Sequence, residues 1–517
     1  MMERDQRVAA GAPARDTDVL IAGAGPTGLA LALALHRLGV PFRIVDKAAA
    51  AGTTSRALIL HARTLELYRQ IGVADAVIAA AHKVEAVNLW TGGRVRARLP
   101  FGDIGARVSP YPYSVIFPQD AHERLLIGVL RDRGVEVERA VELTGLAVDA
   151  RGVCATLRGS AGTERVTARF VAGCDGAHSA VREGLGVALP GGTYDHLWYV
   201  ADVVAHGPLA NGEINVSMST RDALAVMPMG GDEIRLVGQA APNADGSPPA
   251  WDAVDKRLLA ELRTQVEAVR WFSTYRVHHR VASAFRRDAG FLVGDAAHLH
   301  SPVGGQGMNT GIGDAFNLAW KLAAVARGDA EPALLDTYEA ERIAFARQLV
   351  ATTDRVFSLL NGESAPSVLF RTVIAPTFMP LLLRTGAGRR AAFRILSQTA
   401  IEYRRGGISA GRAGAVRGGD RLPWAGDTDN FAPLASLAWQ AHVYGDPSPQ
   451  QRARCARRAL PLHAFPWSDG ARRAGLARDA LYVVRPDGYV GLADASPDAH
   501  AIDGYLPSYR FAGAAVA

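Results

Sequence analysis

Cysteine is scarce in this chain of 517 residues, which contains only Cys154, Cys174 and Cys455. The three lie far apart in the sequence, and none belongs to a Cys-x-x-Cys pair. Their number and spacing argue against a disulfide framework and against a structural zinc site, and they fit a reducing compartment. We therefore predict a cytoplasmic protein in which each cysteine is a small buried side chain rather than a nucleophile.

Long apolar runs and clusters of like charge are also missing. The apolar segment VIAPTFMPLLL is interrupted by Pro376 and Pro380 and falls short of the ~18 apolar residues that a membrane-spanning helix needs. Residues 1–16 are polar, lack the apolar core of a signal peptide and predict a flexible tail. The formal net charge is +6, but the arginines are scattered. We therefore expect a soluble protein with neither nucleic acid nor a membrane as a partner.

The hydrophobic pattern changes along the chain, which is too long for a single core. Residues 17–46 are typical of a strand, a helix and a second strand, and this βαβ order predicts a parallel pair. Residues 191–285 predict short strands of a mostly antiparallel sheet, interrupted by one helix near residues 252–267. Long helices are expected from about residue 332 to 403, before a Gly- and Arg-rich linker and a C-terminal unit.

The segment DVLIAGAGPTGLALALALHRLGVPFRIVD carries a nucleotide-binding signature. Its Gly23-x-Gly25-x-x-Gly28 follows a strand and opens a helix, and Asp46 ends the next strand about 20 residues later. The first glycine permits the tight turn, the second lets the backbone approach a pyrophosphate, and the third allows close helix packing. The free N–H groups at the helix N-terminus favour phosphate. The pattern predicts a dinucleotide site without deciding between FAD and NAD.

Three motifs taken together resemble one known family. GAGPTGLALA, VAGCDGAHSAVRE and GDAAHLHSPVGGQGMNTGIGDAFNLAWKL are similar to motifs of the single-component FAD-dependent aromatic hydroxylases, the para-hydroxybenzoate hydroxylase-like flavoprotein monooxygenases. The resemblance covers residues 17 to about 400 and is strongest to the larger phenol hydroxylase-like and polyketide-tailoring members, which carry a C-terminal thioredoxin-like domain.

The resemblance implies an α/β (α+β composite) fold, with a Rossmann-like FAD-binding domain and an inserted, mostly antiparallel substrate domain. We expect the FAD-binding domain in residues 17–85, 110–190 and 286–365, the substrate sheet in 86–109 and 191–285, a helical connection in 366–405, and a thioredoxin-like domain without Cys-x-x-Cys in 406–517.

The resemblance also implies which residues hold FAD, tightly and without a covalent bond. Those matching the ADP half are Gly23, Gly25, Pro26, Thr27, Gly28, Asp46 and Lys47. Those matching the phosphate, ribityl and ring contacts are Arg56, Gln119, Arg124, Asp175, Gly176, Gly294, Asp295, Pro302, Gly305, Gly307, Met308 and Asn309. The GGQGMNTG segment precedes a helix, and the free N–H groups there form a positive patch suited to the N1–C2 edge of reduced flavin.

Two histidines in the third motif, His298 and His300, have the H-x-H spacing of a possible metal pair. We expect no metal, because the sequence offers no partner set that would complete a tetrahedral site. The resemblance places His298 beside the cofactor, and we interpret His300 as a packing residue. Pro302 and the pair Gly304-Gly305 would let the backbone approach a flat ring. The stretch is therefore interpreted as one wall of a flavin pocket.

The resemblance implies an NAD(P)H-dependent hydroxylase of aromatic substrates, phenolic or polyketide-like. In that family NAD(P)H reduces FAD, O2 adds at flavin C4a, and the resulting hydroperoxide transfers oxygen to the ring. Neighbouring residues of a strand face opposite sides, so Trp198 and Tyr199 cannot both line one pocket. The candidates for substrate contact or proton transfer are Tyr194, His196, Trp198, Tyr199, Met227, Gln239 and Pro302.

Two alternative functions stay open. The same scaffold supports epoxidation or Baeyer–Villiger oxygenation, and a related flavoprotein can act as an oxidase or shelter an intermediate without hydroxylating it. Tryptophan halogenation is disfavoured, because the W-x-W-x-I-P segment of flavin halogenases is absent. The sequence is compatible with NADH or NADPH and with a monomer or a homodimer, and it assigns no specific substrate.

Overall fold

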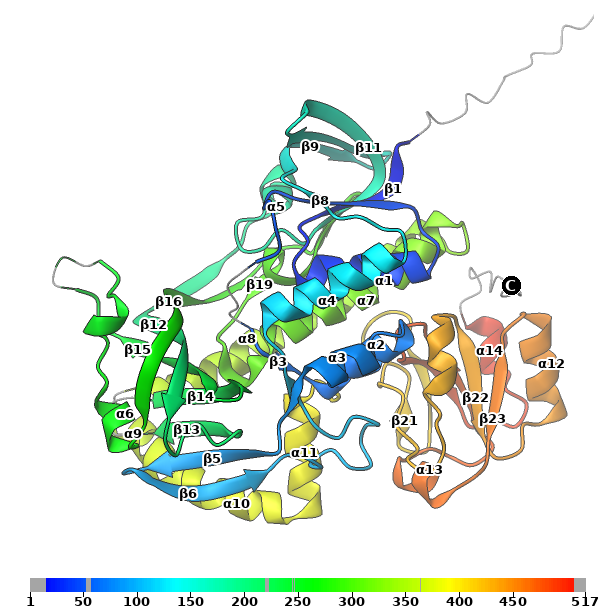
Figure 1. Ribbon diagram of the computed structural model, residues 1–517. Helices are drawn as coiled ribbons and strands as arrows, with labels where there is room; N and C mark the ends of the chain where they lie inside the picture. The colour runs from blue at the N-terminus through cyan, green and yellow to red at the C-terminus, as the bar shows by residue number, and fades with distance from the viewer. Residues whose placement is uncertain are drawn as a thin grey trace, which may run out of the picture.

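The computed structural model describes residues 15–52, 57–218, 223–243, 245, 247–362 and 364–505. Arg56, expected at the flavin, lies outside the described residues, as does most of the expected N-terminal tail. Figure 1 shows a central part with helices α1, α4 and α7, a second sheet to one side of it, and a C-terminal part to the other.

The central part contains an eight-stranded sheet built from three stretches of the chain. Strand β1 lies in its middle, parallel to β2 on one side and to β11 on the other, and β18 continues the parallel arrangement. A hairpin, β9–β10, extends antiparallel from β11. The strands are β1 (Thr17–Ala22), β2 (Phe42–Asp46), β8 (Glu138–Arg139), β9 (Glu142–Asp149), β10 (Gly152–Gly159), β11 (Gly162–Gly173), β17 (Arg286–Arg287) and β18 (Gly290–Leu292).

Helix α1 (Pro26–Arg37) is the centre of the helical layer on this sheet, where it packs against α4 and α7. Its residues from Gly28 to Leu35 are all buried, which explains why its sequence is apolar on every side. Pro26 starts the helix, and Gly39, with φ +68°, follows its end. The other helices of this part are α2 (Ala62–Gln70), α3 (Ala74–Ala80), α4 (Gln119–Asp132), α5 (Ala180–Gly184) and α7 (Gly307–Ala326).

The second sheet also has eight strands and is mostly antiparallel. Its order is β19-β16-β12-β15-β14-β13-β5-β6, so the early hairpin β5–β6 pairs with strands from much later in the chain. The strands are β5 (Ala86–Thr91), β6 (Arg94–Pro100), β12 (Gly191–His206), β13 (Ile214–Met218), β14 (Ala223–Gly230), β15 (Glu233–Ala240), β16 (Gln265–Val281) and β19 (His298–Leu299). A small sheet of β3 (Ile59–Leu60), β7 (Val115–Ile116) and β4 (His82–Lys83) joins the two parts.

The predicted fold class is confirmed, but three local expectations are wrong. The helix expected near residues 252–267 is only α6 (Arg257–Glu261), because β16 already begins at Gln265 and pairs along β12. Cys154 is exposed rather than buried, since it lies on the outer side of the hairpin strand β10.

The third wrong expectation concerns the proline-containing apolar segment. Helix α8 (Asp336–Asn361) is followed by α9 (Ala365–Leu369), a π-helical turn (Phe370–Ile374), α10 (Ala375–Arg384) and α11 (Gly386–Leu396). Residues Ala365–Arg384 form one continuous helix, long and apolar enough to cross a membrane by length and composition alone. Pro380 lies inside it, and Pro376 follows the π-helical turn, where the altered hydrogen-bond register accommodates a residue without an N–H.

The C-terminal part has a six-stranded sheet of its own, in the order β21-β20-β25-β24-β22-β23. Cys455 is buried on α12, and none of the three cysteines forms a disulfide among the residues described. The elements are β20 (Ala410–Ala413), β21 (Val416–Arg417), β22 (Gln440–Tyr444), α12 (Pro449–Arg457), β23 (Leu462–Phe465), α13 (Asp469–Arg473), β24 (Leu481–Val484), β25 (Val490–Asp494) and α14 (Ala501–Gly504).

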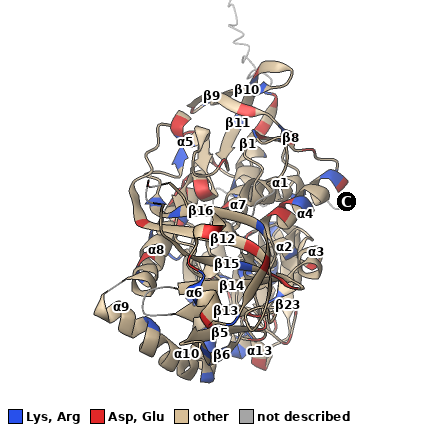
Figure 2. Ribbon diagram, turned by 60° about the vertical axis from the view of Figure 1, so that its left-hand side comes forward, with Lys and Arg blue, Asp and Glu red and all other residues tan. Residues whose placement is uncertain are grey.

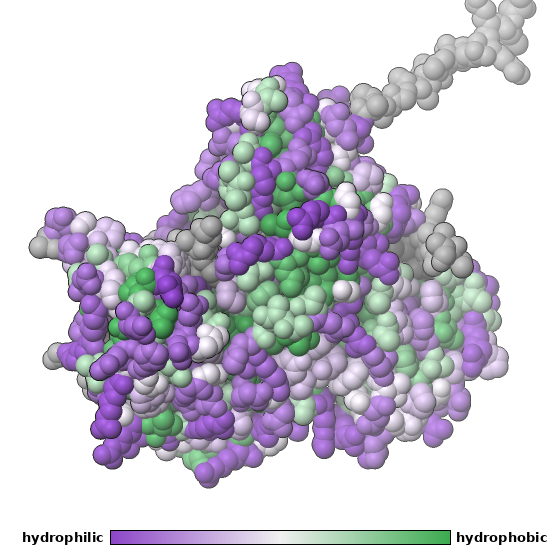
Figure 3. Space-filling model, in the orientation of Figure 1, coloured by the Kyte–Doolittle hydropathy of each residue, from purple (hydrophilic) through white to green (hydrophobic). Residues whose placement is uncertain are grey.

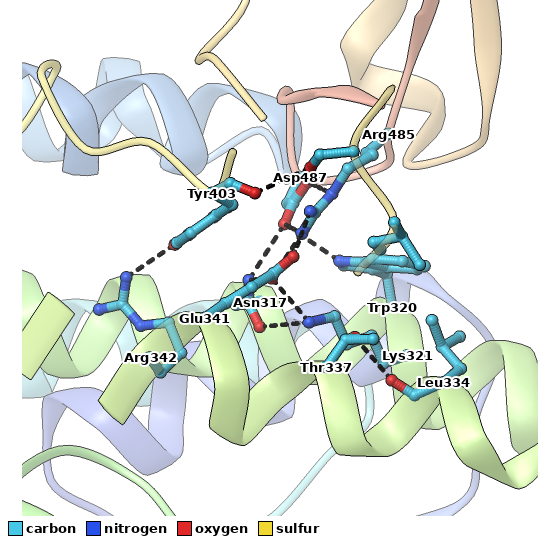
Figure 4. A network of polar contacts seen from close by, with 12 residues as sticks. Asn317, Trp320, Lys321, Leu334, Thr337, Glu341, Arg342, Tyr403, Arg485 and Asp487 are labelled. Carbon is cyan, nitrogen blue, oxygen red and sulfur yellow. Dashed lines mark hydrogen bonds and ion pairs between the residues drawn. The ribbon is translucent and has the colours of Figure 1, made fainter. Parts of the chain in front are cut away.

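A buried network of charged side chains joins this C-terminal part to α7 and α8 (Figure 4). Arg485 donates to both carboxylate oxygens of Glu341, at 2.6 and 2.9 Å, and Lys321 donates to the same carboxylate at 2.8 Å. Asp487 accepts from Arg485 at 2.7 Å and from the Trp320 indole at 3.1 Å. Asp487 therefore does more than form the turn that its Pro-Asp-Gly sequence predicts. We call these five residues the polar seam.

Candidate flavin and substrate site

The glycines of the first motif do two different things. A Cβ on Gly23 would lie 2.3 Å from the carbonyl oxygen of Cys174, and a Cβ on Gly28 would lie 2.0 Å from the carbonyl oxygen of Gly23. These two positions thus need glycine for the protein's own packing. A Cβ on Gly25 would meet nothing within 4 Å. The space in front of Gly25, at the N-terminus of α1, is therefore open to a ligand.

Asp46 lies beside this glycine-rich turn at the end of β2. Its carboxylate accepts hydrogen bonds from the backbone N–H groups of Ala24, at 2.7 Å, and Ala48, at 2.8 Å. Arg139 is 3.6 Å away. The backbone contacts fix the carboxylate next to the first turn of α1, which is where an acid reaches a ribose hydroxyl in a dinucleotide site. The neighbouring Lys47 is exposed.

The N-terminus of α7 is brought to the same region as that of α1. A Cβ on Gly311 of α7 would lie 2.3 Å from the hydroxyl oxygen of Thr27 on α1. Asp314 of α7 accepts from the backbone N–H of Gly294 at 3.1 Å and pairs with His298 at 2.8 Å. The third motif is thus fastened to α7, and two helix N-termini, each with free N–H groups, converge on one place.

Asp314 keeps its charge although it is buried. Burial opposes its ionisation, but Arg342 and His298 outweigh this effect and hold its pKa below the usual value. Arg342 donates to Asp314 at 2.5 Å and to the Tyr403 hydroxyl at 2.7 Å. This chain of contacts connects the third motif to the region of the polar seam, where Arg485 lies 5.2 Å from the Tyr403 ring.

The Gly304-Gly305 turn is held in place by residues that the sequence did not single out. Both glycines have positive φ, +74° and +64°. His61 donates through Nε2 to the Gly304 carbonyl at 2.8 Å, and its Nδ1 accepts from the Ser114 hydroxyl at 3.0 Å. Burial lowers the pKa of His61 to about 4, so the ring is neutral and carries the single N–H that this arrangement needs. His61 stands five residues after Arg56, and no motif in the sequence around it points to this role.

Asn309 makes the corresponding link from α7. Its side-chain oxygen accepts from the His61 backbone N–H at 2.9 Å and from the Thr64 hydroxyl at 2.7 Å. Its amide nitrogen donates to the carbonyls of Ile59 and Gly305, both at 2.8 Å. The Asn309 side chain is therefore fully used in tying the start of α7 to β3 and α2, which leaves the backbone of this turn to face a ligand.

His300 presents an unpaired acceptor in the same wall. Its Nδ1 donates to the Ser301 carbonyl at 2.9 Å, so in the neutral ring Nε2 carries a lone pair. Burial lowers the pKa of His300 to about 4. Nε2 is buried without a hydrogen-bond partner among the described residues, and a Cβ on Gly307 would lie 3.6 Å from it. An unsatisfied buried acceptor at a helix N-terminus fits a site that a polar, flat cofactor completes.

The remaining predicted cofactor residues surround this region to different degrees. Gln119 starts α4 and donates to Glu123 at 2.9 Å, whereas the Arg124 side chain is 60% exposed and pairs with Asp120. Asp175 is largely used in capping α5, where it accepts from the Ser179 hydroxyl and the Val181 N–H, and burial raises its pKa. Pro26 and Met308 lie in the first turns of α1 and α7. Gly176, Asp295 and Pro302 lie in loops or short turns.

An aromatic cluster lies between the second sheet and α8. Trp198 of β12 packs with Phe357 of α8, their rings 5.4 Å apart, and Tyr194 lies 4.5 Å from the same phenylalanine. Val303, from the glycine-rich turn, packs against the same apolar cluster, so the cluster borders the candidate flavin wall. The Tyr194 hydroxyl donates to Asp354 of α8. The Trp198 indole N–H is buried and has no partner in the described part of the chain.

The structure separates the other candidates for substrate contact. Tyr199 packs on the opposite face of the sheet, against Phe272 and Trp251, as strand alternation predicts. His196 is exposed, and Met227 belongs to a different cluster beside β3 and β7. Gln239 pairs directly with Trp198 across the sheet, so it lies on the same face, and it donates to Asn361 at the end of α8 at 3.3 Å. Of the sheet candidates, Tyr194, Trp198 and Gln239 therefore face α8, and the α8 residues they meet carried no signal in the sequence beyond helical periodicity.

Comparison with known proteins agrees with this geometry. A family model described as FAD binding domain matches residues 16–353. The 6-methylpretetramide 4-monooxygenase of Streptomyces rimosus is 38% identical over 405 residues, covering 77% of this chain and 69% of the relative. The structure of the anhydrotetracycline hydroxylase OxyS from Streptomyces rimosus superposes with a TM-score of 0.77 at 29% identity, covering 96% of this chain and 99% of OxyS. The flavin-dependent monooxygenase PieE, solved in complex with FAD and substrate, gives 0.78 at 25% identity, covering 95% and 98%.

Proposed function

The chain belongs to the FAD-dependent aromatic hydroxylases, and from this premise we propose that it uses NAD(P)H and O2 to hydroxylate a phenolic or polyketide-like ring. One observation supports the proposal above the others. Val303, in the turn that leads into α7, packs in the same apolar cluster as Trp198 and Phe357. A cofactor held at the N-terminus of α7 would therefore lie beside this aromatic cluster, where we place a flat substrate.

The protein's contribution is to hold the cofactor and to place charge beside it. When bound, FAD supplies hydride acceptance from NAD(P)H and the activation of O2. We assign the ADP half to Gly25, Gly28 and Asp46, and the pyrimidine edge to the backbone N–H groups of Gly307 and Met308. These N–H groups are at the positive end of a 20-residue helix, where they stabilise negative charge on a reduced ring.

We assign to this aromatic cluster the roles of orienting the substrate and excluding water. Trp198, Phe357 and Val277 present apolar surface, which limits unproductive release of hydrogen peroxide. Tyr194 and Asp354 form a hydrogen-bonded pair at the side of this cluster. We assign this pair the role of a proton relay, in which Tyr194 accepts the substrate phenol proton as its own proton passes to Asp354. A phenolate ring is a stronger nucleophile than a phenol toward electrophilic oxygen.

The activity is tested by mixing the purified FAD-loaded protein with NADH or NADPH and a panel of phenols and polycyclic aromatic phenols. We expect substrate-stimulated nicotinamide oxidation with O2 uptake and little free peroxide. The mass and NMR spectrum of the product distinguish ring hydroxylation from epoxidation and from Baeyer–Villiger insertion. Absence of nicotinamide oxidation with every substrate would instead favour a flavoprotein that oxidises or shelters an intermediate.

The cofactor assignment is tested by Gly25→Val. The backbone at Gly25, φ −76° and ψ −176°, is compatible with valine, and the added side chain meets no protein atom at Cβ. The variant should therefore fold, with an unchanged circular dichroism spectrum. Its affinity for FAD should fall at least about tenfold, a loss of ~1.4 kcal/mol or more of binding free energy. Gly128→Val, at an open position on α4, is the control and should keep its flavin. Full flavin content in Gly25→Val would contradict the assignment.

The relay assignment is tested by Tyr194→Phe. Loss of the hydroxyl should lower kcat for phenolic substrates by about 100-fold, the lower range of general acid–base effects, while KM changes little. The kcat of Tyr194→Phe should also depend more steeply on the acidity of the substrate phenol, because without the relay the phenol must ionise unaided. Tyr199→Phe removes the same group on the opposite face of the sheet and should leave kcat unchanged. Equal rates for wild type and Tyr194→Phe would remove Tyr194 from the mechanism.

A further inference from the structure

The continuous helix Ala365–Arg384 exposes a stripe of large apolar side chains. Phe378 is 61% exposed and Leu382 is 55% exposed, one helical turn apart, and Leu369, Val373 and Leu381 are each exposed by half. Helix α10 lies at the lower edge of the molecule, next to β5 and β6, in Figures 1 and 2. Soluble proteins rarely leave such a row of leucine and phenylalanine uncovered, so the stripe indicates a binding surface.

The rim of this stripe is predominantly basic, although Asp103, in the loop after β6, pairs with Arg389. From Ser364 to Leu396 the sequence has five arginines and neither Asp nor Glu. Arg384, Arg390 and Arg394 are exposed, and none makes an ion pair with any of the described residues. Strand β6, which packs beside α10, adds the exposed Arg94 and Arg96. The partner that fits this surface combines an apolar layer with negative charge.

We propose that this helix attaches the protein to an anionic lipid surface, with the apolar stripe inserted at the level of the headgroups and the arginines on lipid phosphates. An amphipathic helix with a basic border has the chemistry for this position. The proposal replaces the expectation, drawn from the sequence, that no membrane is a partner. It does not depend on the proposed hydroxylase activity.

The helix lies on the lipid surface and does not span it. Arg371, in the middle of the segment, is buried against the protein, where it donates to the Gly362 carbonyl at 2.5 Å. Ala375 and Leu383 are also buried on that side. One side of the helix is therefore committed to the protein's own core, and only the opposite side is free to contact acyl chains.

A second copy of the chain fits this surface less well. In a two-fold symmetric dimer the same patch meets itself, so the arginine rim of one copy would approach the arginine rim of the other. The segment from Ser364 to Leu396 has no carboxylate of its own, and the neighbouring Asp103 is already paired with Arg389, so Arg384, Arg390 and Arg394 would approach their copies without a counter-charge. An anionic bilayer satisfies both the apolar stripe and the positive rim.

The proposal is tested by flotation of the full FAD-loaded protein with phosphatidylcholine vesicles, with and without phosphatidylglycerol. We expect binding to the phosphatidylglycerol vesicles that weakens as salt is raised. The double variant Phe378→Ser/Leu382→Ser should lower the partition coefficient about tenfold or more at either salt concentration. Arg390→Gln/Arg394→Gln should weaken binding to anionic vesicles and reduce its salt dependence.

Matched controls are available elsewhere on the surface. Val269→Ser changes an apolar side chain of the second sheet that is 37% exposed, and Arg452→Gln changes an exposed arginine on α12. Both should bind vesicles as the wild type does. Flavin content and melting temperature exclude variants that fail to fold. The proposal is overturned if the wild type does not float with anionic vesicles, if both double variants bind unchanged, or if sedimentation velocity shows a dimer that Phe378→Ser/Leu382→Ser abolishes.

Discussion

The FAD-binding part of the chain is flanked by two surfaces of opposite kinds, one buried and charged and the other exposed and apolar. Toward the C-terminal part, Lys321 and Glu341 of α7 and α8 are fully buried with Arg485 and Asp487, two positive and two negative side chains. On the other side, α8 leads into α9–α11, where leucine and phenylalanine side chains remain exposed. On the face seen in Figure 3, the periphery is mostly hydrophilic and apolar residues gather in a few areas, the largest near its middle.

The difference indicates which of the two surfaces is permanent. Buried charges are tolerated only when they are paired and hydrogen-bonded, because an uncompensated charge in the interior costs several kcal/mol. The polar seam meets this requirement only while the C-terminal part stays docked. Exposed apolar side chains carry no such requirement and are available to a partner that comes and goes. The polar seam is therefore a permanent interface, and the exposed apolar stripe is available for reversible contact.

The largest effect is expected when the seam loses its shared carboxylate. Glu341→Gln leaves Arg485 and Lys321 buried with one negative charge fewer, which should cost about 3–5 kcal/mol of stability. The melting temperature, followed by calorimetry, should fall by several degrees. Glu402→Gln, which removes a carboxylate from the surface pair with Arg404, should change stability by about 1 kcal/mol or less.

The pH dependence of this effect has a definite sign. Burial by itself opposes ionisation of Glu341, but Arg485 and Lys321 outweigh it and lower the pKa to about 2 from an unfolded value of 4.5. A depressed carboxyl pKa contributes stability that is fully present above pH 4.5 and is lost as the pH falls toward 2. The difference between wild type and Glu341→Gln should shrink over that range. A difference that stays constant would show that Glu341 acts through packing rather than charge.

The glycine-rich turn could be predicted from the sequence, because a backbone conformation that requires glycine shows directly as glycine residues. Gly23-x-Gly25-x-x-Gly28 and Asp46 predict a strand, a turn and a helix N-terminus, and the structure has all three. His61 and Thr64 escaped prediction, because their roles arise only when β3 and α2 are brought against the start of α7. Such contacts between remote segments leave no local pattern.

The two neighbouring surfaces were harder to predict for a different reason. Asp487 was correctly placed in a turn, but its burial against Trp320 depends on docking of the whole C-terminal part. Pro376 and Pro380 were expected to keep the apolar run shorter than a membrane-spanning helix, and the π-helical turn that precedes Pro376 has no sequence signature of its own. In both cases tertiary structure overrode a sound local rule.

The smallest effect is expected at the exposed stripe, and it gives the sharpest form of the comparison. Phe378→Ala should change the free energy of unfolding by less than about 1 kcal/mol, since the ring is already 61% exposed. Phe393→Ala, on the neighbouring helix α11, is the matched control: its ring is 2% exposed and packs onto Gly105, so its loss should cost about 3–5 kcal/mol. The same substitution thus separates a side chain that the fold needs from one that it does not. If Phe378→Ala destabilised the isolated protein as strongly as Phe393→Ala, the stripe would be part of the core, and no partner would be required to explain it.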